Sequence, residues 1–241
     1  MPENKKFETP VYNRLLAALP AAAYERLFPR LEQIALIYGA NIYRPGEIIR
    51  HVYFPNSGII SLLSSVNDNA TLEVGLVGRE GIVGLPVFLG VKTSNIQAIV
   101  QGAGFAMKMK AADFLAESQN DGALARLLRR FTHSLLTQTS QSAACYCFHP
   151  VEARLARWLL MMSDRMETGD FPMTQGFLSS MLGVRREAVN KSAVILQRQR
   201  LISYSRGNVS ITNQAGLENA ACKCYGIIKD EAKSFPVKVK N

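Results

Sequence analysis

MTQGFLSSMLGVRREAVNKSAVILQRQRLISYSRGNVSITN, residues 173–213, predicts two short helices, a tight turn and a small hairpin. Thr174 can cap the first helix, because its hydroxyl can accept a backbone N–H that the helix leaves unpaired. Gly183 stands where a left-handed residue would end that helix. We expect the second helix at about 185–199, and Gly207 allows the positive φ of a tight hairpin. Together these elements predict a winged helix-turn-helix.

The second helix has an apolar side and a polar side. At about 100° per residue, Val189, Ala193 and Leu196 fall together on the apolar side. The other side offers basic, amide and methyl groups, which suit phosphates and base edges. We therefore predict a DNA-binding surface made of Arg185, Arg186, Glu187, Asn190, Lys191, Val194, Arg198 and Arg206. The alternative is a solvated helical domain whose charges only confer solubility.

The charge distribution favours a polyanionic partner for the C-terminal part. The 241 residues carry a net charge of +9, and the length fits one or two domains with full cores. Residues 1–149 hold 14 Lys/Arg and 11 Asp/Glu, a difference of +3. The remainder holds 14 and 8, a difference of +6, and nucleic acid is the partner that such an excess suits.

Targeting signals are not found in the sequence. No apolar run reaches the roughly 18 residues of a membrane span, and the polar N-terminus leads into no signal-peptide core. We therefore expect a cytoplasmic protein that uses no membrane, with reduced cysteines. Cys145-x-Cys147 and Cys222-x-Cys224 could form a metal or redox set if their helices met. A C-x-C spacing on a helix points the sulfurs about 200° apart, so we expect separate thiols and no metal.

The N-terminal part changes from a helical to a strand pattern. Residues 11–37 have helical spacing, broken at Pro20 and Pro29. Short apolar runs separated by turn residues follow from about Ile34 to Met109, which indicates a β-roll or barrel. The fold class is therefore α+β. We expect a β-roll sensor domain with N-terminal helices at 1–120, a dimerisation helix and hinge at 121–148, and the winged helix-turn-helix domain at 149–241.

A long helix is expected at 121–146, after a short one at 111–118. Its apolar positions lie close to the 3.5-residue seam of a two-stranded coiled coil. We expect a homodimer contact through Leu124, Leu127, Leu128, Phe131 and Leu135. An ordinary helix lying on the β-roll is the alternative. A dimer would place two recognition helices about 34 Å apart, as a palindromic duplex site requires.

The hinge is expected at His149-Pro150, since proline suits the first position of a helix. The next helix, VEARLARWLLMMSDRM, should bury Leu155, Trp158, Leu159 and Met162. We expect one last helix from a cap at Asn213 to about Lys233, with the basic tail KVKN beyond it.

The whole chain resembles the Crp/Fnr family of bacterial transcription regulators. The resemblance is carried by RPGEII, VYFPNSGIISLL, LVGREGIVGLP, HPVEARLARWLL and, best, GVRREAV at 183–189, where the family commonly has G-x-S-R-E-x-V. It implies a jelly-roll-like effector domain of the cyclic-nucleotide-binding type, homodimers on double-stranded DNA, and RNA polymerase as a possible partner. It also assigns base-reading places to Arg186 and Glu187 and a basic place to Lys191.

The effector places of the cyclic-nucleotide-binding members fall on Leu85 and on Ile96-Gln97. A phosphate buried there without a cation would be very costly, so we expect neither cAMP nor cGMP, although Lys92 is near in sequence. The iron–sulfur branch uses N-terminal cysteines, and this chain has none before Cys145. Haem would have only His51 and His133 before the hinge, and a lone His is usually structural.

Two other functions are alternatives to a DNA-binding regulator. A sensor dimer could act through protein partners, which the intact polar side of the second helix argues against. A cupin-like metalloenzyme needs two or three His with a carboxylate, and residues 34–109 contain His51 alone. No nucleophile–base pair or phosphate-binding loop is found either. We therefore predict a transcription regulator that is not an enzyme, with its effector unidentified.

Overall fold

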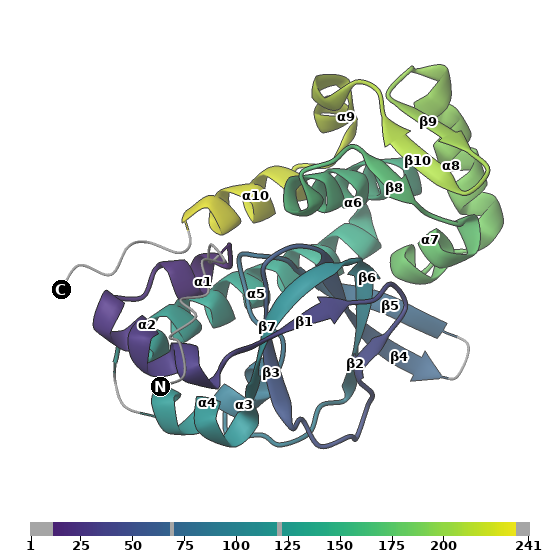
Figure 1. Cartoon of the computed structure of the whole chain (residues 1–241). Coiled ribbons are helices and arrows are strands. Elements are labelled where there is room, and N and C mark those ends of the chain that lie inside the picture. The colour runs from purple at the N-terminus through teal and green to yellow at the C-terminus, as the bar shows by residue number, and fades with distance from the viewer. Residues whose placement is uncertain (1–11, 68–69, 120–121, 235–241) are drawn as a thin grey trace.

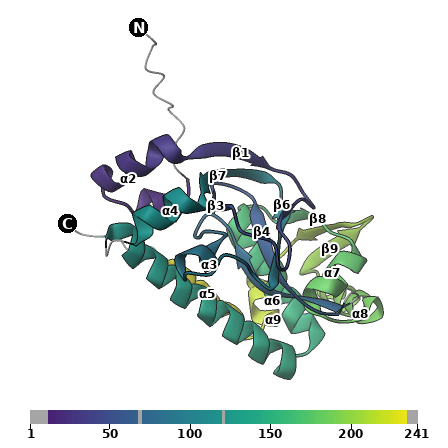
Figure 2. The same cartoon turned by 90° about the horizontal axis from the view of Figure 1, so that it is seen from below.

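The chain folds into an N-terminal β-roll and a C-terminal helical domain with its own small sheet (Figure 1). The structure is a computed structural model that describes residues 12–67, 70–119 and 122–234. A long helix, α5 (Ala123–Phe148), runs beneath the β-roll and leads to the hinge (Figure 2). Within the described residues, no helix has both the length and the apolar character needed to cross a membrane.

The β-roll consists of two antiparallel sheets with strand orders β1-β7-β3 and β2-β6-β4-β5. Alternating side chains from both sheets meet in one core, as the short apolar runs indicate. The strands are β1 (Glu32–Leu36), β2 (Asn41–Tyr43), β3 (His51–Pro55), β4 (Ile59–Asn67), β5 (Ala70–Val77), β6 (Ile96–Gly102) and β7 (Gly104–Lys110).

Short helices flank the β-roll. They are α1 (Arg14–Ala17), α2 (Ala21–Leu27), the 3-10 turn η1 (Phe28–Arg30), α3 (Leu85–Phe88) and α4 (Ala111–Ser118). The helix expected at 111–118 is confirmed by α4. The helical spacing expected to 37 ends earlier, because residues 32–36 pair with β7 as the first strand.

The apolar side of α5 covers the β-roll. Leu124, Leu127, Leu128 and Phe131 are at most 4% exposed and belong to the β-roll core. These four residues, which we expected at a dimer seam, are therefore too buried to contact a second copy. For them the alternative, a helix lying on the β-roll, is the better description. The fifth, Leu135, is half-buried against the same core.

The hinge leads into α6 (Val151–Met166), the central helix of the C-terminal domain. All four residues expected inside it, Leu155, Trp158, Leu159 and Met162, are buried. The helix also joins the two domains, because the Trp158 Nε1 donates to Glu73 Oε1 on β5 over 2.8 Å.

The winged domain adds a three-stranded sheet of order β8-β10-β9 and four more helices. The elements are β8 (Asp170–Pro172), α7 (Gln175–Leu182), α8 (Arg186–Arg198), β9 (Ile202–Ser205), β10 (Asn208–Ile211), α9 (Gln214–Ala220) and α10 (Cys224–Ser234). The single last helix expected after Asn213 is in fact two helices, because residues 221–223 leave the helical path. The Asn213 cap is confirmed, and the KVKN tail lies outside the described residues.

Candidate nucleic-acid interface

The helix-turn-helix has the local contacts that the sequence predicts. The Phe177 N–H donates to Thr174 Oγ1 over 3.2 Å at the start of α7. Gly183 ends α7 with a φ of 60°, the left-handed conformation that glycine adopts without steric cost. The guanidinium of Arg154 on α6 donates to the carbonyl of Leu182, which fixes the turn from below. These contacts fix the orientation of α8 relative to α7.

The apolar side of α8 anchors it in the domain. Val189, Ala193 and Leu196 are at most 1% exposed and pack in the second core with α6 and α7. The opposite side faces outward, and every residue predicted for DNA binding is exposed. These residues are Arg185, Arg186, Glu187, Asn190, Lys191, Val194, Arg198 and Arg206. Arg185 precedes α8 without a side-chain capping bond, as expected for arginine.

An open groove of about 680 Å³ lies between α7, α8 and the hairpin. It contains three of the predicted residues, Arg186, Asn190 and Arg206. It also contains polar residues that the sequence did not predict for DNA binding, Thr174, Gln175, Gln197 and Tyr204. Helical projection of α8 could have found Gln197, which lies on that helix, but not the other three, which come from neighbouring elements that only the fold brings beside it.

Polar side chains line this groove in defined positions. The Gln175 Nε2 donates to Asn190 Oδ1 over 3.1 Å, which ties the first turn of α7 to α8. Arg186 lies across Gly176, where an added Cβ would stand 2.6 Å from its Nη2. Because Gly176 has no side chain, the guanidinium of Arg186 can reach the groove, although Arg186 lies at the edge of the outward side of α8.

The wing presents Arg206 at its tip. Arg206 and Gly207 have φ values of 50° and 79°, the two positive values of a type I′ hairpin turn. Arginine in the left-handed region costs energy that asparagine or glycine would avoid. The Tyr204 hydroxyl donates to the Met173 carbonyl over 3.0 Å, so the wing is held against the residue before α7.

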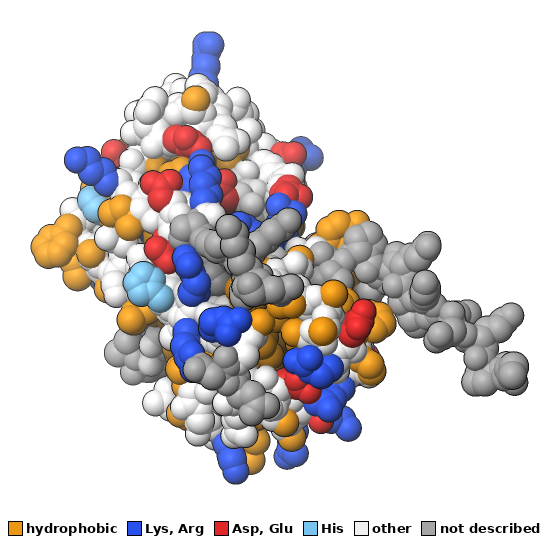
Figure 3. Space-filling view, turned by 90° about the vertical axis from the view of Figure 1, so that its left-hand side faces the viewer, with side chains coloured by type: hydrophobic (Ala, Val, Ile, Leu, Met, Phe, Trp, Pro, Cys, Tyr) orange, Lys and Arg blue, Asp and Glu red, His pale blue; other side chains and the backbone are white. Residues whose placement is uncertain are grey.

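The basic side chains of this surface carry uncompensated charge. Within the described part of the chain, Arg185, Arg186, Lys191, Arg198 and Arg206 form no ion pair with an acidic residue. On the face of the molecule away from α8, by contrast, Lys and Arg side chains are mixed with Asp and Glu side chains in the part that grey atoms do not cover (Figure 3). A positive surface with donors at a groove suits a polyanion that carries hydrogen-bonding edges.

The β-roll holds an apolar cavity of about 130 Å³ at the expected effector places. Leu85 and Ile96 line it, together with Leu135 of α5. Gln97 does not; its amide donates to Asn41 Oδ1 at the surface. Lys92 is exposed, and none of the described residues that line the cavity carries a charge. The cavity therefore suits an apolar occupant better than a phosphate.

Comparison with known families identifies the C-terminal region. Residues 153–220 match the family described as the Crp-like helix-turn-helix domain. This match spans α6 to α9 and therefore includes the groove. No curated protein sequence matches the chain.

Solved structures share the whole fold. A regulator of the Crp/Fnr family from Eubacterium rectale superposes with a TM-score of 0.69 at 14% identity, covering 87% of this chain and 98% of that one. FixK2 from Bradyrhizobium japonicum gives 0.68 at 17% identity, with 80% and 98% covered. A CRP-family regulator from Thermus thermophilus gives 0.64 at 20% identity, with 78% and 96% covered. At these identities the likeness establishes the fold.

Proposed function

Since residues 153–220 match the Crp-like helix-turn-helix domain and the chain shares the fold of Crp/Fnr-family regulators, we propose that it is a transcription regulator of this family, in which α8 and the wing read a specific double-stranded DNA site. The supporting observation is the anchored α8, whose outward side joins a groove lined by Arg186, Asn190 and Arg206. Members of this family are regulators rather than enzymes, and the chain acts accordingly through binding.

The side chains have different roles in this proposal. Arg186 and Glu187, at the N-terminal end of α8, contact base edges, where arginine suits guanine and glutamate suits cytosine. Further along the exposed side of α8, Asn190 suits adenine, Lys191 suits a phosphate and Val194 suits the methyl group of thymine. Arg185, Arg198 and Arg206 bind phosphates and set the register of the domain on the duplex.

Two copies of the chain bind one palindromic site in this proposal. The buried side of α5 belongs to the β-roll, so the copies pair through the opposite side of the helix. Its exposed residues include Leu136, at 63%, together with Ala143 and Ala144. An apolar side chain this exposed on a long helix suits contact with a second copy. The dimer then holds the two α8 helices about 34 Å apart, on successive major grooves.

The β-roll acts as the effector domain, and its ligand is not cAMP or cGMP. An effector that fits the apolar cavity would bind beside Leu135 of α5, and so would bias the position of that helix. It regulates only if it binds one arrangement of the dimer better than another. The chain operates in the cytoplasm, where RNA polymerase is available as a partner.

Selection of DNA fragments from a random pool, followed by anisotropy titration at two salt concentrations, tests this function. One enriched palindromic site should emerge, and its affinity should fall steeply with salt because bound Lys and Arg release counterions. Lys191→Ala should weaken binding, whereas Lys92→Ala removes an equal charge from the β-roll and should not. A dimer that shows no sequence preference at physiological salt, yet captures a partner protein, would favour the sensor alternative.

A further inference from the structure

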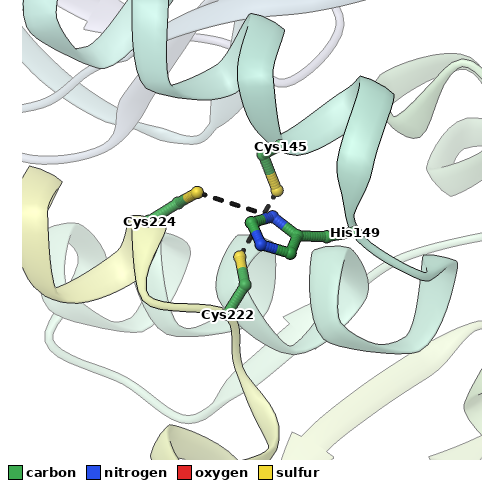
Figure 4. Close-up of side chains that lie close together, drawn as sticks. All are labelled: Cys145, His149, Cys222 and Cys224. Atoms are coloured by element: carbon green, nitrogen blue, oxygen red, sulfur yellow. Dashed lines mark hydrogen bonds between the residues drawn. The ribbon is translucent and has the colours of Figure 1, made fainter.

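Four metal-ligating side chains converge at the hinge, outside the DNA-binding surface. Cys145 lies in the last turn of α5, and His149 is the residue that ends this helix. Cys222 and Cys224 come from the other end of the C-terminal domain, at the start of α10. One ligand atom from each lies within 4.8 Å of the others (Figure 4). The four side chains point towards a common centre.

The path of the backbone explains why the sequence argument against this cluster fails. That argument placed both residues of each C-x-C on one helix. Cys222 instead lies in the break between α9 and α10, so its sulfur and that of Cys224 turn to the same side. Cys147 is exposed and takes no part. His149, one helical turn after Cys145, supplies the fourth ligand, and the C-x-C spacing gave no reason to look for it.

Two of the distances between the ligand atoms are close to those around a single tetrahedral ion, and all four atoms lie within 4.8 Å of one another. The Cys145 and Cys222 sulfurs are 3.4 Å apart, and Cys224 Sγ is 3.6 Å from His149 Nδ1. Bonds of about 2.3 Å to sulfur and 2.0 Å to nitrogen at tetrahedral angles place ligand atoms about 3.5–3.8 Å apart. An iron–sulfur cluster puts several atoms between its ligands and needs a wider cage. Three thiolates and one imidazole are a known donor set for structural zinc.

A buried cation beside the cluster supports this assignment. Arg157 of α6 is 1% exposed, and its Nη1 donates to Ser142 Oγ over 3.3 Å. Its Nε has no hydrogen-bond partner, and no described carboxylate forms an ion pair with it. Tyr146, Cys145, Cys222 and Glu73 all lie close enough to interact electrostatically with this guanidinium. Zinc bound by three thiolates carries a net charge of −1, which would add to the compensation of a buried arginine that has no carboxylate in ion-pair contact.

We propose that Cys145, His149, Cys222 and Cys224 bind one Zn²⁺ ion that clamps the hinge between the β-roll and the winged domain. Binding displaces the protons of the three thiols and uses the imidazole lone pair, so no redox partner is needed. The ion joins the end of α5 to the start of α10, two segments from different domains. It thereby restricts the rotation of α6 and α8 relative to α5, the geometry on which two-site DNA binding depends.

The primary test uses the full-length protein, purified without oxygen, stripped by a chelator and reloaded with Zn²⁺ or Co²⁺. Mass spectrometry of the metal should give one ion per chain, and Co²⁺ should show the intense absorption of a tetrahedral thiolate site. Cys222→Ser should weaken zinc binding by more than about 100-fold, since losing even an outer-shell partner costs about 10- to 100-fold. Cys147→Ser is the matched control and should bind zinc normally.

A second measurement distinguishes a clamp from a passive site. Hydrogen exchange across residues 145–155 should slow on zinc binding in the wild type and in Cys147→Ser, and not in Cys222→Ser. Because metal content and exchange are measured without DNA, they stay informative even if no DNA site is found. Failure to retain Zn²⁺ or Co²⁺ would overturn the proposal, as would a Cys145–Cys222 disulfide in the protein isolated without oxygen. Unchanged exchange with zinc bound would overturn the clamp.

Discussion

The basic residues of α6 and α8 have opposite environments although the helices are neighbours in one domain. On α6, Arg154, Arg157 and Arg165 are all less than 10% exposed. On α8, Arg186 and Arg198 are exposed and unpaired with any acid in the described part of the chain. Both helices carry arginines among apolar residues in the sequence. The comparison teaches that an arginine in this domain has one of two environments. It is buried and bound to protein groups, as Arg154 is to Leu182 and Arg165 to Glu80, or it is exposed on the α8 surface.

This difference changes the meaning of the charge excess. The +6 of residues 150–241 includes three arginines that are at least nine-tenths buried. The α8 surface instead has a local excess: five exposed cations, two of which line the groove, have no acidic ion-pair partner among the described residues. Placement therefore supports DNA binding more strongly than the total charge does.

The largest expected effect comes from the buried pair that joins α6 to the β-roll. Arg165 Nε donates to Glu80 Oε1 over 2.7 Å, and both side chains are largely buried. Arg165→Met should lower the free energy of unfolding by about 3–5 kcal/mol, because Glu80 would be left buried without its cation. Chemical denaturation measures the loss.

The double variant Arg165→Met with Glu80→Met serves as the control for that pair. Replacing both partners should recover most of the stability, since no uncompensated charge remains. An equal loss of unfolding free energy in the single and double variants would mean that the interaction between Arg165 and Glu80 is not what joins the domains. The contrast with the exposed arginines of α8 would then be weaker.

A second carboxyl at the same junction should make stability depend on pH. Burial raises the pKa of Glu73 to about 7, against hydrogen bonds from Ser61 and Trp158 that lower it. The folded chain therefore binds this proton more tightly than the unfolded chain. Its stabilising contribution is present below the unfolded pKa near 4.5 and declines as the pH rises to about 7. The decline should total about 3 kcal/mol.

Glu73→Gln removes that titration and keeps most of the shape. Denaturation of both proteins from pH 4.5 to 8 should give wild-type stability falling relative to the variant across the window, with no further change above it. Parallel curves for the two proteins would show that Glu73 titrates as it does in the unfolded chain, and that the junction is wetter than its burial indicates.

On the α8 side, the largest effect should come from Arg186. Arg186→Ala should reduce discrimination at one base pair by about 1–3 kcal/mol while the chain stays folded. Titration of the selected site against single-base variants measures this loss. Arg200→Ala, which removes an exposed arginine from beyond the end of α8, is the matched control and should leave the base preference unchanged. If Arg186→Ala retains its discrimination between bases, other residues of the groove must read the bases.

Local rules predicted the winged domain well because its decisive residues act on their near neighbours. Thr174 caps the helix that it precedes, Gly183 ends the same helix, and the spacing of Val189 and Leu196 fixes which side of α8 is buried. Each of these depends on a contact within a few residues or on the helical period, so the sequence alone was enough.

Features that depend on partners in other elements could not be predicted in this way. The apolar side of α5 fits a coiled-coil seam and a β-roll cover equally well, and only the sheets decide between them. Arg157 and Arg165 become internal because Ser142 and Glu80, which lie outside α6, meet them. The break at 221–223 has no glycine or proline to indicate it. Tertiary packing overrides the helical propensity there, and this brings Cys222 to the hinge.

The smallest expected effect separates stability from binding at the wing. Arg206 has a φ of 50°, which asparagine tolerates at lower cost, so Arg206→Asn should stabilise the fold by about 0.5–1 kcal/mol. The same change removes a phosphate contact, which should weaken binding to all DNA sequences alike and reduce the salt slope by about 1. Lys92→Asn controls for the lost charge. A more stable protein whose DNA binding is weaker but equally selective would mean that Arg206 contributes to DNA binding and not to stability. Arg165 is the opposite case, because it contributes to stability and not to DNA binding. Weaker discrimination instead would make Arg206 a base-reading residue.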